Sequence, residues 1–173
     1  MLKHPTPKNS RLKAVPAGVL SFATIRRFVT EAKTAGRRVV TTNGSFDILH
    51  IGHVRNLAFA KRQGDALIVG VNSDASVRSY KGFGRPITPA LERAEIVAAL
   101  KYVDAVFIFN DATPVKWLKI LRPHIHVKGA DRTMDQIPEQ TVVESGGGVV
   151  VRAPYLKNKS TTGIIKKIRR ITL

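Results

Sequence analysis

The chain has 173 residues and no cysteine. It therefore suits one α/β domain, lacks a disulfide framework and a thiolate metal site, and is expected in the cytoplasm. No apolar run approaches the ~20 residues of a membrane span and no secretory signal is evident, so we expect no membrane partner. The net charge of +17 is concentrated at the two ends, since residues 41–156 carry fourteen basic and eleven acidic side chains; with only 6% aromatic residues, we expect no specific nucleic-acid partner.

Helices and strands alternate along the predicted domain. Residues 1–16 contain three prolines and several basic side chains, which predicts a flexible basic arm before a domain over 17–173. In chain order we expect a helix over 22–35, a strand over 37–42, a helix over 51–63, a strand over 66–71, a short helix over 73–78, a loop over 81–89, a helix over 90–100, a strand over 105–109, a helix over 113–121, a strand over 125–128, a weak helix over 138–145, a strand over 149–152 and a final helix over 161–171. This order predicts a single α/β domain, a Rossmann-like five-stranded parallel sheet with helices on both faces. Ligands on such sheets bind beyond the carboxyl ends of the strands.

The run Asn43-Gly-Ser-Phe-Asp-Ile-Leu-His-Ile-Gly-His53 connects the first strand to the following helix. His50 and His53 are three residues apart, on one face of the first helical turn. Unpaired N–H groups and the macrodipole at a helix start favour an anion, and two imidazoles add donors. The run therefore predicts a phosphate site. The alternatives are an ordinary helix cap and one half of a metal site.

These motifs together resemble the nucleotidyltransferase superfamily that carries His-x-Gly-His on a Rossmann-like sheet. Further matching segments follow in order: Val71-Asn72-Ser73-Asp74, Lys81-Gly-Phe-Gly-Arg85-Pro86, Glu92-Arg93, Tyr102-Val-Asp104, Val127-Lys128-Gly-Ala-Asp131 and Ser160-Thr-Thr-Gly-Ile-Ile165. They are similar to the branch that transfers AMP from ATP to D-glycero-β-D-manno-heptose 1-phosphate, giving ADP-heptose and pyrophosphate for lipopolysaccharide core synthesis. The resemblance covers about residues 39–168. It implies ATP and heptose 1-phosphate as partners, Mg²⁺ arriving with ATP, and leaves a homodimer open.

The resemblance also implies a role for individual residues. The catalytic residues are then His50, His53 and Lys81. The nucleotide-binding residues are Gly44, Ser45, Phe46, Gly52, His53, Lys128, Gly129, Ser160, Thr161 and Thr162. The substrate-binding residues are Asp47, Asn72, Arg85, Arg93 and Asp131, and no protein residue is expected to ligate a metal. Such a set fits the chemistry, because an acceptor phosphate is already an anionic nucleophile and needs alignment and charge neutralisation more than a base.

Several of these residues have ordinary structural interpretations too. Asp47 fits a helix N-cap equally well, and Lys81 and Arg85 fit a solvated basic loop. Arg93 could bind phosphate or pair with an acid. The hydroxyls of residues 160–162 fit caps as well as triphosphate contacts, and the two roles are compatible.

The sequence departs from the superfamily's cytidylyltransferases just before the last helix. They usually carry Arg-Thr-x-Gly there, whereas this chain has Leu156-Lys-Asn-Lys159. We therefore expect ATP to be used ahead of CTP. The alternative function is a cytidylyltransferase for glycerol 3-phosphate or a similar alcohol phosphate, and a nucleic-acid-binding protein is a second alternative. Only about forty residues precede the first strand, so no sugar kinase domain is expected before it.

Overall fold

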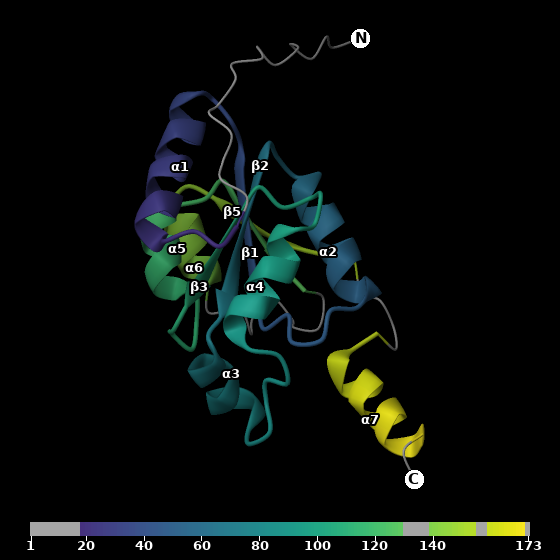
Figure 1. Ribbon diagram of the computed structural model, residues 1–173. Coiled ribbons are helices and arrows are strands. Elements are labelled where there is room, and N and C mark those ends of the chain that lie inside the picture. The colour runs from purple at the N-terminus through teal and green to yellow at the C-terminus, as the bar shows by residue number, and fades with distance from the viewer. Residues whose placement is uncertain (1–17, 130–138, 155–158, 172–173) are drawn as a thin grey trace, which may run out of the picture.

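The computed structural model describes residues 18–129, 139–154 and 159–171, and each predicted strand and helix is present there (Figure 1). In chain order the elements are α1 (Phe22–Thr34), β1 (Val39–Gly44), α2 (Ile51–Lys61), β2 (Ala66–Asn72), α3 (Asp74–Lys81), α4 (Ala90–Ala98), β3 (Ala105–Phe109), α5 (Val115–Leu121), β4 (Ile125–Lys128), α6 (Gln140–Ser145), β5 (Val149–Arg152) and α7 (Thr161–Ile171). The predicted arm, residues 1–16, lies outside the described residues. The prediction is thus confirmed at the level of element type and order.

The five strands form one parallel sheet in the order β3-β2-β1-β4-β5. The central strand β1 has two neighbours, and Val40 pairs with Leu67 of β2 and with Ile125 of β4. The chain leaves β1 toward β2, whereas β4 lies on the other side, so the direction of winding changes between β1 and β4. In open α/β sheets, the crevice outside the carboxyl ends of the strands at such a switch point binds ligands. The Rossmann-like parallel sheet predicted from the sequence is confirmed.

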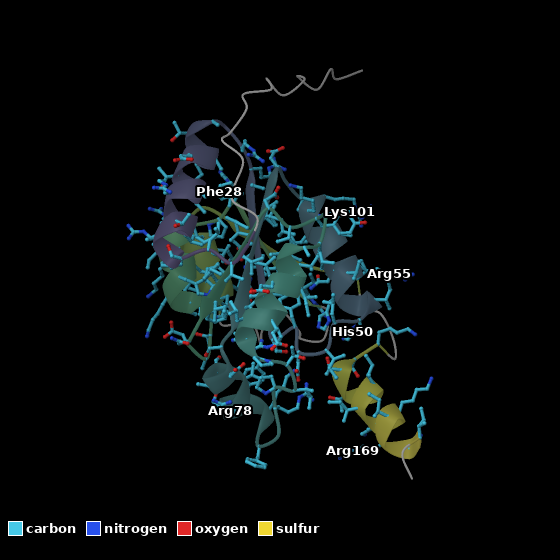
Figure 2. The ribbon with its side chains drawn as sticks, viewed as in Figure 1. Phe28, His50, Arg55, Arg78, Lys101 and Arg169 are labelled. Atoms are coloured by element: carbon cyan, nitrogen blue, oxygen red, sulfur yellow. The ribbon has the colours of Figure 1, made fainter. Side chains whose placement is uncertain are left out.

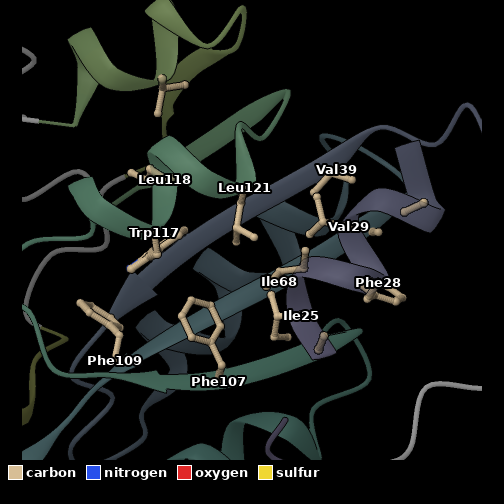
Figure 3. Packing of buried hydrophobic residues seen from close by; sticks show 14 residues of the cluster. Ile25, Phe28, Val29, Val39, Ile68, Phe107, Phe109, Trp117, Leu118 and Leu121 are labelled. Carbon is tan, nitrogen blue, oxygen red and sulfur yellow. The ribbon is translucent and has the colours of Figure 1, made fainter. Parts of the chain in front are cut away.

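Helices cover both faces of the sheet (Figure 1). Successive residues of a strand point to opposite faces, so Val39 belongs to the core under α1 and α5, and Val40 to the core under α2 and α4. Figure 3 shows the first core, in which the Trp117 ring meets the Phe107 ring edge-on at 5.3 Å between centroids. Burial of both faces explains why β2 and β3 are nearly continuous apolar runs.

The last helix, α7, leads away from the body of the domain (Figure 1). Its first residue anchors it, because the Thr161 hydroxyl donates to the carbonyl of Ile48 at 3.1 Å, just before α2. The start of α7 is therefore held close to the start of α2. Within the described part of the chain, no helix has the length and apolar character that crossing a membrane requires.

Candidate active site

The turn between β1 and α2 places two histidine rings at the start of α2. His50 is the N-cap, and its Nδ1 accepts from the backbone N–H of Gly52 at 3.1 Å. His53 Nδ1 accepts from the backbone N–H of His50 at 3.3 Å, and the two rings stack with centroids 3.8 Å apart. Since each Nδ1 is an acceptor, each neutral ring carries its proton on Nε2 and can donate it to an anion. Figure 2 shows His50 at the end of α2 that lies nearest to α7.

Gly52 leaves the room that the His50 ring occupies. A Cβ atom at position 52 would lie 2.8 Å from both Cε1 and Nδ1 of His50, which is closer than atoms pack. A larger residue between the two histidines would therefore displace the first ring. The glycine of His-x-Gly-His has a steric reason in this chain.

We expect Gly52→Ala to lower kcat by tenfold or more, because the displaced His50 ring no longer reaches the same point. The melting temperature should change little, because the ~1 kcal/mol by which alanine favours a helix over glycine offsets the loss of the cap bond from the Gly52 N–H to the His50 ring. Steady-state kinetics measures kcat, and thermal unfolding of the same preparation measures the melting temperature. Unchanged kcat would contradict the steric argument.

Burial and neighbouring cations keep the two rings neutral at pH 7. Burial lowers the pKa of His53 to about 4, helped by the charges of His50 and Lys81. Burial also lowers the pKa of His50, with Lys81 again contributing. The free site therefore presents imidazole N–H donors and not imidazolium charges.

The His53 imidazole should titrate near pH 4, and its Nδ1 should lack a proton at pH 7. Because the folded pKa is below the ordinary 6.5, His53 stabilises the fold fully above about pH 6.5, and this contribution is lost as the pH falls through 4. NMR of ¹⁵N-labelled imidazoles reads both the tautomer and the titration. A midpoint near 6.5 for His53 would contradict this description of the site.

Lys81 reaches the same turn from α3. Its Nζ donates to the Ser45 hydroxyl at 2.9 Å, although the two residues are 36 positions apart. The expectation that Lys81 lies in the glycine-rich loop is wrong by one residue. It ends α3, because Gly82 follows with a φ of 83° and stops the helix.

Asp47 fastens the loop over 82–89 to the turn between β1 and α2, residues 45–50, which we call the phosphate turn after its predicted role. Its buried carboxylate accepts from Arg85 Nε at 2.6 Å, from the Ile87 N–H at 2.7 Å and from the Thr88 N–H at 3.1 Å. Burial alone would raise the pKa of this carboxyl, but the hydrogen bonds from Thr88, Arg85 and Ile87 outweigh it and leave the pKa below its usual value. The N-cap interpretation of Asp47 is wrong, since His50 caps α2.

Arg93 ties three segments together from α4, where its side chain is buried. The guanidinium donates to the carbonyls of Thr88 and Asn72 at 2.8 and 2.9 Å, and to the carbonyl of Ser45. It also forms an ion pair with Asp74 at 2.7 Å. Arg93 thus pairs with an acid, as one of the two interpretations predicts. Its guanidinium also holds the phosphate turn, the end of β2 and the loop in one arrangement.

Lys128 spans the switch point between β4 and β1. Its Nζ donates to Asn43 Oδ1 at 3.1 Å and to Glu139 Oε1 at 2.6 Å, and the Glu139 side chain is 4% exposed. Gly129 follows Lys128 directly, while Asp131 lies outside the described residues. Sequence reasoning missed Asn43 and Glu139. Asn43 could have been found from its place as the first residue of the motif run.

Three further predicted residues, 160–162, lie at the start of α7, and Asn72 ends β2. Ser160 Oγ accepts from the Gly163 N–H at 3.1 Å and so has the capping role. Thr161 is buried on Ile48, and Thr162 is exposed at the start of α7. Asn72 is buried and donates to the Ser76 hydroxyl at 3.0 Å. The structure thus brings the His-x-Gly-His turn, Lys81 and the start of α7 to one edge of the sheet.

The chain is similar to a family of known proteins. The family model described as Cytidylyltransferase-like matches residues 41–167. The chain belongs to this family. As a cytidylyltransferase-like protein it is a nucleotidyltransferase, so the resemblance found in its motifs is confirmed at family level.

The relatives of this cytidylyltransferase-like chain include longer proteins. Bifunctional protein HldE of Geotalea uraniireducens is 47% identical over 153 residues, which is 88% of this chain and 31% of the relative. Bifunctional protein HldE of Mesorhizobium japonicum is 47% identical over 151 residues, 87% of this chain and 30% of the relative. The chain thus spans about a third of the length of these relatives. Among solved structures, the lipopolysaccharide core biosynthesis protein from Thermoplasma volcanium superposes with a TM-score of 0.62 at 29% identity, covering 70% of this chain and 100% of that one.

Proposed function

We propose that the chain transfers AMP from ATP to D-glycero-β-D-manno-heptose 1-phosphate, releasing pyrophosphate and giving ADP-heptose for lipopolysaccharide core synthesis. The observation that carries this proposal is the pair of stacked, neutral imidazoles beside Lys81, at the point where α2 and α7 begin. Membership of the Cytidylyltransferase-like family supports the reaction class. The lipopolysaccharide core protein that shares the fold supports a core sugar as the acceptor.

In the proposed mechanism an acceptor phosphate oxygen attacks the α-phosphorus of ATP, and the bond to pyrophosphate breaks as the new bond forms. The Nε2–H groups of His50 and His53 donate to phosphate oxygens, where negative charge grows in the transition state. Lys81 holds the acceptor phosphate in line. The backbone N–H groups at the start of α7, with the Thr162 hydroxyl, bind the departing pyrophosphate. The acceptor is already ionised, so no residue need act as a base.

We propose Mg²⁺ as the cofactor, held by the triphosphate. Such an ion neutralises charge on the phosphates and usually keeps several water ligands. The Asp47 carboxylate supports this arrangement, because it is engaged with Arg85 and the loop. The protein's part is then to bind the charged nucleotide.

A matrix of ATP and CTP against heptose 1-phosphate and glycerol 3-phosphate tests the proposal by pyrophosphate release. We expect the fastest release with ATP and heptose 1-phosphate, because a site that pairs with the adenine edge rejects a base that leaves its groups unpaired. Faster release with CTP and glycerol 3-phosphate would replace the proposal with the cytidylyltransferase alternative. Tight RNA binding without turnover of any pair would favour the nucleic-acid alternative.

Lys81→Ala should raise KM for heptose 1-phosphate more than KM for ATP, because its Nζ lies beside the turn where the acceptor phosphate is placed. Arg78, exposed on the same helix, provides the control variant Arg78→Ala, which should leave both KM values unchanged. Initial rates over a grid of both substrates separate the two constants. An equal rise in both constants would remove Lys81 from the acceptor side.

Location and assembly complete the proposal. Because the reaction consumes ATP, we propose that it takes place in the cytoplasm. The homodimer stays a prediction, to be measured by light scattering of the full chain.

A further inference from the structure

α7 carries two different surfaces along its length. Ile164, Ile168 and Ile171 recur at helical spacing and form one apolar stripe. Lys166, Lys167, Arg169 and Arg170 fill the rest of the circumference beyond Ile165, and the helix has no acidic residue. At 100° per residue, Lys167 borders the stripe on one side, and Ile165 followed by Arg169 borders it on the other.

The apolar stripe becomes more exposed as α7 leaves the body of the domain. Thr161 is buried and Ile164 is half-buried, whereas Ile168 is 53% and Ile171 is 73% exposed. Figure 2 shows Arg169 toward the outer end of this helix, far from the sheet. The outer turns therefore present isoleucines and cations together on the surface.

We propose that α7 docks on an anionic lipid surface, with its isoleucines among the acyl chains and its cations among the headgroups. A short helix with an apolar stripe bordered by Lys and Arg is the pattern of an interfacial helix that lies in the membrane plane. Bordering cations gain about 1 kcal/mol each near such a surface. The expectation of no membrane partner rested on the absence of a spanning segment, and an interfacial helix needs none.

Charge favours an anionic lipid surface over two other occupants, a second copy of this chain and an RNA. A second copy that paired its α7 with this one would bring two cationic helices together, which like-charge repulsion opposes. RNA would satisfy the cations but would leave the isoleucine stripe unused. An anionic lipid surface matches both surfaces of the helix at once. This inference is separate from the proposed reaction, because it uses residues beyond the start of α7.

The experiment is co-sedimentation of the full chain with vesicles of phosphatidylcholine alone or with one part in three of phosphatidylglycerol. We expect binding to the anionic vesicles that weakens as salt rises. Ile168→Ser/Ile171→Ser should weaken it by about tenfold or more, and Lys167→Gln/Arg169→Gln by about fivefold for each cation removed. A matched control, Arg78→Gln/Lys101→Gln, removes two exposed cations elsewhere and should bind like the native chain.

Three results would overturn the proposal. The first is no binding to anionic vesicles. The second is binding to anionic vesicles that is equally strong in the Ile168→Ser/Ile171→Ser variant. Such binding would be an attraction by charge alone, which RNA would share. The third is a native homodimer that dissociates in the isoleucine variant while the native chain ignores vesicles, which would assign the stripe to a second copy. Pyrophosphate release without vesicles should be the same in the native chain and in both α7 variants, so failure of this inference is distinct from failure of the proposed function.

Discussion

His53→Asn is expected to lower kcat by about 10²–10³, the usual cost of losing one donor to a transition state. Asparagine can keep an acceptor near the position of Nδ1, so the backbone N–H of His50 keeps its partner. It removes the Nε2–H that we assign to the phosphate. The loss should therefore appear in turnover while the start of α2 stays capped.

His53→Gln provides the comparison for this variant. Its longer amide places an N–H nearer the position of Nε2 and should recover part of the lost rate. Single-turnover kinetics with both variants, beside thermal unfolding of each, separate chemistry from folding. If the folded asparagine variant turned over at the native rate, His53 would have no place in the mechanism.

Arg93→Ala is expected to lower the free energy of unfolding by about 3–5 kcal/mol, because the guanidinium is buried and each acceptor left without its donor costs about 1–3 kcal/mol. The variant would leave Asp74 without its partner and three backbone carbonyls without their donor. Since those carbonyls belong to three different segments, the phosphate turn should loosen as well. Urea unfolding measures the stability. Residual activity at a temperature well below the melting range shows whether the phosphate turn has loosened in the folded protein.

Arg78→Ala is the matched control for this loss. Arg78 is exposed on α3, and exposed substitutions usually change stability by less than ~0.5 kcal/mol. An equal change in both variants would mean that the contacts of Arg93 contribute nothing beyond an ordinary surface arginine. Arg93→Lys should fall between them, because lysine keeps the charge but not the planar fork.

The sheet could be predicted from the sequence because each strand and each motif is marked by residues that are close together in the chain. Strands β2 and β3 are short apolar runs bounded by turn residues, and the motif from Asn43 to His53 is one continuous segment of the sequence. The sequence also predicted that Lys81 and Arg85 matter near this turn, but only through a resemblance. Their partners Ser45 and Asp47 are 36 and 38 positions away, and no periodicity shows such a contact.

The buried polar contacts are what the sequence could not show. From the sequence, Arg93 fits a phosphate contact and an ion pair equally well, and its three carbonyl acceptors come together only in the folded backbone. Glu139 gave no signal, since nothing in a weakly helical segment indicates that its carboxylate meets Lys128 across the sheet edge. An ion pair between residues far apart in the sequence can be identified only from the three-dimensional structure.

The loop that Asp47 holds is fixed at its base and exposed at its tip. Its base is fixed by Arg85 and two backbone N–H groups, whereas Phe83 at the tip is fully exposed between Gly82 and Gly84. A change at position 83 therefore disturbs no buried contact of the fold. This tip is therefore a position where new side chains can be tried at almost no cost in stability, while the contacts that fix the base of the loop stay in place.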